Sequence, residues 1–212
     1  MSKEIVITAL NCVAPDSLTV NSETYSKNDE SQFYKTNFDT RAILGKKGTR
    51  SMDKLTGLTV HCIENLLPQV QSQLEAEPER IGLVVGTAQG SMDSIMRFTH
   101  ETLAHDSPDY VNPALFPNTV MNCAAGQSAI WHGFQGPNAT ISCGEISSFA
   151  ALNYAVSLLT KGYVDTLVAG GSEELSEVNI AAKTSLAKKH NRFAKFTEGS
   201  AFFVIEANDI AI

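Results

Sequence analysis

Short apolar runs alternate with segments of helical periodicity along this chain. Runs rich in β-branched and aliphatic residues predict strands over residues 4–10, 81–86, 138–142, 164–170 and 201–206. Between the first four of these runs, apolar side chains recur at the spacing of a helix. Strands that alternate with helices in this way predict an α/β fold.

Two of the predicted helices differ in how their apolar residues are distributed. The first starts where Ser51 can cap it, has apolar residues at helical spacing, and ends at Pro68. The second follows residues 143–145 and ends at Lys161 and Gly162, which are typical stop residues. Its apolar residues cover nearly every face: Ile146, Phe149, Ala150, Leu152, Ala155, Val156 and Leu159. This distribution predicts an interior helix.

The longest polar segment covers residues 11–40 and predicts an extended surface loop. The basic patch Lys46, Lys47 and Arg50 comes soon after it. Such a patch is either a solvated loop or a docking spot on a partner, and the sequence alone leaves both interpretations open.

Composition narrows the class of protein. The chain has 212 residues, of which 43% are hydrophobic and 18% charged, which is typical of a globular protein with a substantial core. The sequence contains neither an apolar run of about 18 residues nor a basic-then-apolar leader, so we expect a cytoplasmic protein without a membrane span. A net charge of −7 argues against binding to nucleic acid. It also argues weakly against this chain being the main binding surface for an acidic carrier protein.

Cysteines and histidines do not form a pattern that predicts a metal site. The four cysteines, Cys12, Cys62, Cys123 and Cys143, have no CxxC spacing, which suits a reducing compartment without disulfides. His100 and His105 would lie about 140° apart on a helix, off one common face. The glycine-rich turn at 86–91 lacks the lysine of a phosphate-binding loop. We therefore expect no metal and no cofactor.

The turn formed by Cys143, Gly144 and Glu145 is the first candidate site. It lies at the predicted N-terminus of the interior helix, where free N–H groups and the helix dipole favour negative charge. A cysteine in that place would be shifted toward its thiolate. A glutamate there is an ordinary first-turn carboxylate.

Residues 136–174 resemble the N-terminal half of the β-ketoacyl synthases, which have the thiolase-like fold. Further similar segments extend the resemblance over almost the whole chain. The matching residues are Gly136-Pro137-Asn138, Ile141-Ser142, Gly162 and Ala169-Gly170-Gly171-Ser172-Glu173, together with residues 44–58, the set Pro117, Asn122, Ala125, Gly126 and Ser128, and residues 197–201. The resemblance implies a single domain over residues 1–212, with one thiolase-type half: a five-stranded mixed sheet, helices on both faces, and no C-terminal half.

The resemblance also shows what this chain lacks. The nucleophilic cysteine of the synthases falls on Glu145, and Cys143 takes the position of a threonine two residues earlier. The family also uses two histidines from the C-terminal half, and no histidine here lies in a matching motif. Covalent catalysis without a base and an oxyanion partner is feeble, so we expect no condensation by this chain alone.

A pseudo-enzyme of this kind resembles the chain length factor of type II polyketide synthases, which pairs with an active ketosynthase. That resemblance implies that the strand at residues 138–142 lies at the sheet edge and pairs with the partner, and an edge with Asn138, Thr140 and Ile141 and no charge favours such pairing. It also implies a polyketide tunnel with Phe116, Val120, Met121 and Phe149 on its wall. The acyl carrier protein would bind mainly through the partner. Known chain length factors usually carry glutamine at the position of Glu145 and keep both halves of the fold.

Two alternatives from other classes remain open. In the first, the chain is a stand-alone acyltransferase or condensing enzyme that uses Cys143 as nucleophile. In the second, it is a homodimeric decarboxylating subunit in which Glu145 acts as an acid or base.

Overall fold

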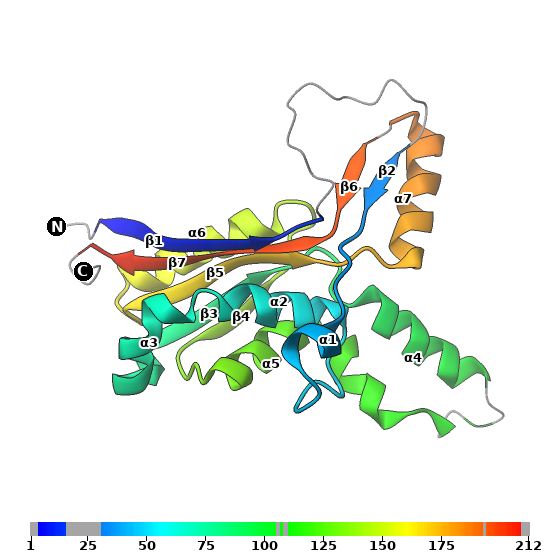
Figure 1. Ribbon diagram of the computed structural model, residues 1–212. Coiled ribbons are helices and arrows are strands. Elements are labelled where there is room, and N and C mark those ends of the chain that lie inside the picture. Colours follow the sequence, from blue (N-terminus) through cyan, green and yellow to red (C-terminus); the bar gives the residue numbers. More distant parts are fainter. Residues whose placement is uncertain (1–3, 16–30, 105–106, 108–109, 193, 209–212) are drawn as a thin grey trace.

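The main sheet has five strands in the order β1-β7-β5-β3-β4 (Figure 1). We describe a computed structural model over residues 4–15, 31–104, 107, 110–192 and 194–208. The strands are β1 (Ile5–Val13), β3 (Ile81–Gly86), β4 (Asn138–Ile141), β5 (Thr166–Glu173) and β7 (Gly199–Ala207). β3 runs parallel to β4 and β5, whereas β7 is antiparallel to β1 and β5. The predicted mixed five-stranded sheet is therefore confirmed.

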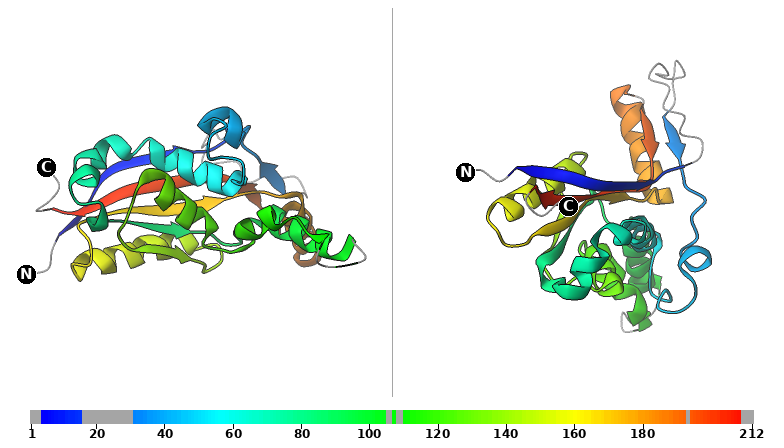
Figure 2. Two further views of the ribbon diagram at one scale, coloured as in Figure 1. Left: turned by 90° about the horizontal axis from the view of Figure 1, so that it is seen from below. Right: turned by 60° about the vertical axis from the view of Figure 1, so that its left-hand side comes forward.

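Helices cover both faces of this sheet. α2 (Lys54–Glu64), α3 (Leu67–Ala76) and α5 (Cys123–His132) lie on one face, and α6 (Ser147–Thr160) lies on the other (Figure 2). The alternation of side chains along a strand explains the two cores. Leu83 and Val85 of β3 pack toward α2 and α5, while Val84 packs toward α6.

Several boundaries differ from the sequence prediction. Pro68 does not end the first helix; it lies in the first turn of α3, where a missing N–H costs nothing. Asp53, and not Ser51, caps α2, because its Oδ1 accepts the Thr56 N–H at 2.9 Å. The predicted loop at residues 11–40 contains the end of β1 and strand β2 (Gln32–Tyr34), and helix α1 (Thr40–Leu44) begins at its last residue. Its residues 16–30 lie outside the described part.

A small second sheet projects from one end of the main sheet (Figures 1 and 2). In it, β2 pairs in parallel with β6 (Lys195–Thr197), and α7 (Glu177–His190) lies beside the pair. Phe33 and Phe196 stack across the pair with ring centroids 5.4 Å apart. The other elements are η1 (Pro78–Arg80), α4 (Met92–Ala104) and η3 (Pro113–Thr119).

The expectation of a wholly interior α6 is wrong. Ala151, Ala155 and Leu159 are buried against the sheet, but 62% of Ile146 and 75% of Phe149 are exposed. Periodicity could not separate the two faces because both are apolar. Only one of them contacts strands in the described part of the chain, and no described element covers the other.

Close packing between α6 and the strand ends predicts a contrast between two glycine substitutions. A Cβ on Gly86 would lie 2.5 Å from the Ser147 carbonyl oxygen, whereas a Cβ on Gly126 of α5 meets nothing within 4 Å. Gly86→Ala should therefore lower the free energy of unfolding by roughly 1–3 kcal/mol. Gly126→Ala should raise it by about 0.5–1 kcal/mol, because alanine favours a helix. Urea denaturation measures both, and equal effects would contradict this packing.

Candidate functional site

The candidate site lies where β3, β4 and β5 present their carboxyl ends to the start of α6. Gly86 ends β3, and Gly171 lies near the end of β5. A Cβ on Gly171 would lie 1.9 Å from Ser148 Oγ. The two glycines thus let the first turn of α6 approach the sheet directly.

One side chain holds the turn before α6 in shape. Ser147 Oγ accepts the Cys143 N–H at 2.9 Å and donates to the Gly144 carbonyl oxygen at 2.5 Å. Gly144 has φ of +64°, a conformation that residues with a Cβ rarely adopt. The turn is therefore determined by Gly144 and Ser147.

Glu145 and Cys143 are both exposed in this turn. The helix starts at Ser147 with Ile146 as its N-cap, so Glu145 precedes the first turn and the interpretation as a first-turn carboxylate is wrong. Among the described residues, none donates a hydrogen bond to the Glu145 carboxylate, and none forms an ion pair with it. The side chain is thus free to meet a ligand or another surface.

Glu173 fixes the neighbouring turn between β3 and α4. Its carboxylate accepts the Ala88 N–H and lies 3.4 Å from Thr87 Oγ1. Ser142 Oγ donates to the Ala88 carbonyl oxygen at 3.2 Å. Burial raises the pKa of Glu173, and the hydrogen bonds from Ala88 and Thr87 oppose the rise. The sequence identified the tight turn but not this anchor.

The predicted edge residues line an open border of the sheet. Asn138 Nδ2 donates to the Ala125 carbonyl oxygen at 2.9 Å, and Ile141 packs against the core around α6. Thr140 Oγ1 is buried and has no hydrogen-bond partner in the described part of the protein. Among the described strands, β4 pairs only with β3, and no described strand pairs with its other edge. Ile130 of the adjacent α5 is 84% exposed.

The predicted tunnel residues lie on two elements. Phe116 in η3 is 56% exposed and packs against Phe98 of α4 at a centroid distance of 5.9 Å. Val120 follows η3 and is 44% exposed. Met121 is half-buried with its sulfur against Gly90, and Phe149 projects from α6.

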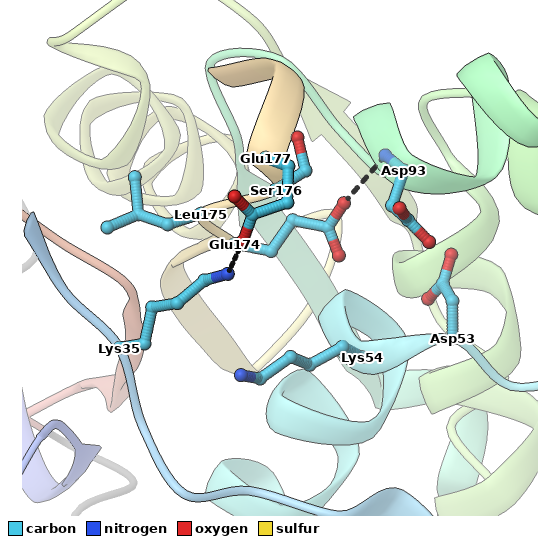
Figure 3. A pocket seen from close by; sticks show the side chains of 8 residues that line it. All are labelled: Lys35, Asp53, Lys54, Asp93, Glu174, Leu175, Ser176 and Glu177. Carbon is cyan, nitrogen blue, oxygen red and sulfur yellow. Dashed lines mark hydrogen bonds and ion pairs between the residues drawn. The ribbon is translucent and has the colours of Figure 1, made fainter. Parts of the chain in front are cut away.

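A polar pocket of about 170 Å³ lies beside the start of α7 and was not predicted (Figure 3). Its lining residues are Lys35, Asp53, Lys54, Asp93, Glu174, Leu175, Ser176 and Glu177. Next to it, buried Glu198 accepts hydrogen bonds from Lys54 Nζ and from the Thr36 N–H. Burial would raise the pKa of Glu198, but the hydrogen bonds from Lys54 and Thr36 outweigh it and lower the pKa. This network ties residues of five segments together.

Buried histidine and thiols lie in the core and not at the site. His132 is 7% exposed with Nε2 3.2 Å from the Val60 carbonyl oxygen, and burial lowers its pKa to about 4. Burial raises the pKa of Cys62 to about 12 and raises that of Cys123. These groups are therefore kept uncharged at neutral pH.

The described residues contain neither a metal-binding cluster nor a membrane-spanning helix. Within those ranges, no group of three or more His, Cys, Asp or Glu side chains could hold a metal ion. No described helix combines the length and the apolar character needed to cross a bilayer.

Glu174 in the pocket predicts a pH-dependent stability. Burial and the nearby Asp53 and Asp93 raise its pKa to about 7, although the Asp93 N–H bond opposes this. The folded state thus retains a proton that the unfolded state releases, and the resulting stability is lost as pH rises from about 4.5 through about 7. Relative to wild type, Glu174→Gln should gain roughly 2–3 kcal/mol in free energy of unfolding between about pH 5 and pH 8.

The measurement is urea denaturation of both proteins at both pH values. The low pKa of His132 gives a trend of opposite sign, with stability gained as pH rises toward 6.5. Both proteins share that trend, so it cancels in the difference. A constant difference between the two proteins would contradict a protonated Glu174.

Most of this chain matches a known protein family. The family described as "Beta-ketoacyl synthase, N-terminal domain" matches residues 17–199. The 3-oxoacyl-[acyl-carrier-protein] synthase 2 of Vibrio cholerae is 29% identical over 140 residues, which are 66% of this chain and 34% of that enzyme.

Two solved structures are similar over nearly the whole chain. The ishigamide ketosynthase/chain length factor is 28% identical with a TM-score of 0.77, and the match covers 97% of this chain and 62% of that one. A type II polyketide ketosynthase in complex with its acyl carrier protein has a TM-score of 0.83 at 20% identity and covers 100% of this chain and 64% of that one. The second likeness shows the fold alone. This chain spans less than two thirds of the proteins that it matches.

Proposed function

Since this chain belongs to the β-ketoacyl synthase family, whose N-terminal domain it carries, we propose that it is a non-catalytic subunit of the chain length factor type. It pairs with an active ketosynthase in polyketide or related fatty-acid-like biosynthesis, and it works in the cytoplasm. The single observation that carries the proposal is the glutamate at the position of the family's nucleophile. The 28% identity to a ketosynthase/chain length factor supports it.

With Glu145 at the position of the nucleophile, the acyl-enzyme of the synthases cannot form there. A thiolate forms a thioester that a carbanion can attack, whereas a carboxylate cannot form that thioester and repels a malonyl group. No histidine lies in the turn, and the nearest thiol in sequence is Cys143. The fold is thus kept while the reactive atom is absent.

An open edge and exposed apolar side chains support a paired subunit. Leu83 N–H donates to the Pro137 carbonyl oxygen and Thr87 N–H to that of Ile141, so these carbonyls face β3. In a parallel pair the backbone groups of the intervening Asn138 and Thr140 then face the open edge. Exposed Ile130 and Phe149 add apolar surface on the flanking helices. An edge of this kind is a liability unless another chain covers it.

The proposed tunnel wall consists of Phe116, Val120, Met121 and Phe149. In the paired complex, these side chains limit the space for the growing chain, and their volume sets how many units fit. The ketosynthase partner supplies the nucleophile, the histidines and most of the contact with the acyl carrier protein.

Pairing is tested by co-expression of this chain with an active ketosynthase from the same organism. We expect a stable heterodimer with the wild-type chain in affinity purification and light scattering. Thr140→Pro removes one N–H group that faces the open edge of β4, and it leaves the hydrogen bonds between β4 and β3 in place. It should therefore weaken the heterodimer at least about tenfold. Leu103→Ala, at an 80% exposed position on α4, is the matched control and should leave pairing unchanged.

Other results of the same assay would contradict the proposal. A homodimer of this chain that decarboxylates malonyl-carrier protein would favour the role of Glu145 as an acid or base. Turnover by the chain alone, abolished by Cys143→Ser and spared by Glu145→Ala, would favour a Cys143 enzyme.

The wall residues predict a change in product length. In the co-purified complex, Phe116→Ala opens space and should shift products to longer chains, while Val120→Phe should shift them to shorter ones. Mass spectrometry of the released products measures the shift, with Leu103→Ala again as control. Unchanged product lengths in both variants would exclude these residues from the wall.

A further inference from the structure

The segment that presents most of the proposed tunnel wall has little packing of its own. η3 is a 3₁₀ helix of seven residues, which is longer than such helices usually run, and Pro117 within it lacks an N–H. Asn118 is the only buried residue in the segment 112–122 and is 5% exposed. The backbone that presents Phe116 and Val120 therefore depends on contacts with other segments.

Asn118 connects η3 to two of these segments. Its Nδ2 donates to the Ser51 carbonyl oxygen at 2.7 Å, in the turn before α2. Its Oδ1 accepts hydrogen bonds from the Cys123 thiol at 3.2 Å and from Gln127 Nε2 at 3.3 Å, and both donors belong to α5. Burial raises the pKa of Cys123, so the sulfur keeps the proton that it donates. Both ends of the buried amide are thus bonded.

The turn before α2 also binds α4. Ser94 Oγ, in the first turn of α4, donates to Asp53 Oδ2 at 3.1 Å. Phe98, one turn further along α4, packs against Phe116 of η3. These contacts connect η3, residues 51–53 and α4 in a closed cycle. We call this set the η3 clamp, and its three contacts are Asn118 with Ser51, Asp53 with Ser94, and Phe98 with Phe116.

The two polar contacts of the clamp define an arrangement more than they stabilise it. A buried hydrogen bond adds only about 0.5–1.5 kcal/mol net, because folding takes both groups out of water. An apolar side chain of similar volume could fill the position of Asn118 without desolvating an amide. A buried polar group that is fully bonded instead favours one arrangement of its partners.

We propose that Asn118 and Ser94 are positioning residues, which hold Phe116 and Val120 in place and so determine how sharply the product length is defined. The inference rests on the proposed function and adds to it. The volume of the wall side chains sets the main product length, whereas the η3 clamp sets the spread around that length. A supporting shell that is loose by about 1 Å is enough to make a formed site imprecise.

Two substitutions each remove one polar contact of the clamp. Asn118→Leu removes the hydrogen bond to Ser51, and Ser94→Ala removes the one to Asp53. In the co-purified heterodimer, each should raise the fraction of products that differ from the main length at least about threefold, with the main length unchanged. The double variant should resemble the single variants, because one break already opens the cycle. Mass spectrometry of the released products measures these fractions.

Two control variants separate positioning from stability. Ser128→Ala also removes a buried serine hydroxyl, but Ser128 Oγ has no hydrogen-bond partner in the described part of the chain. It should leave the products unchanged. Val70→Ala creates a cavity beside α3, which lies at the other end of the molecule from α4 (Figure 1). It should lower the melting temperature and leave the products unchanged as well.

Three results would overturn the inference. A wild-type product pattern in both clamp variants overturns it and leaves the proposed function standing. An equal spread in Val70→Ala overturns it too, because loss of stability alone would then broaden the products. If the wild-type chain forms no heterodimer, the proposed function fails, and hydrogen exchange of the isolated chain tests the clamp. Amides of residues 112–122 should then exchange at least about tenfold faster in both clamp variants, and unchanged exchange there overturns the clamp.

Discussion

Direct contact between the start of α6 and the ends of β3 and β5 is the constraint on which the site depends. Gly86 and Gly171 leave no side chain between the sheet and Ser147 and Ser148, so the helix begins immediately above the strand ends. Ser147 then bonds back to Cys143 and Gly144 and fixes the turn. The turn on this scaffold exposes the side chains of Cys143, Glu145 and Ile146. Glu145 is the one on which the proposed function depends.

The shape of the turn does not depend on which residue occupies position 145. The turn is held by glycine, a serine hydroxyl and backbone groups, so the exposed residue at position 145 can change without affecting the fold. Exposed Phe149, Ile146 and Ile130 are harder to explain in an isolated chain, because large apolar patches on a protein surface mark places where other surfaces bind. The molecule thus combines a turn that carries Glu145 with exposed apolar side chains on the neighbouring helices.

The sequence predicted the strands of the main sheet well because each contains a short run of β-branched, aliphatic or aromatic residues. It failed where distant partners decide the structure. β2 and β6 pair across a long sequence separation, with Phe33 stacked on Phe196, and nothing local in residues 11–40 indicates that partner. The helix at residues 147–160 was mispredicted as interior because the apolar residues on its exposed face have the same pattern as core residues. The pocket around Glu174 brings together charged residues from distant segments, and their spacing in the sequence does not indicate that they lie close together.

Acylation of the isolated chain tests the central claim most directly. The purified protein is incubated with an acyl-carrier thioester and malonyl-carrier protein, and intact mass spectrometry follows both the polypeptide and the carrier-bound products. The account predicts an unmodified chain and no elongated product, because Glu145 stands where the thiolate would be. An acyl adduct mapped to Cys143, or elongation by the chain alone, would contradict it.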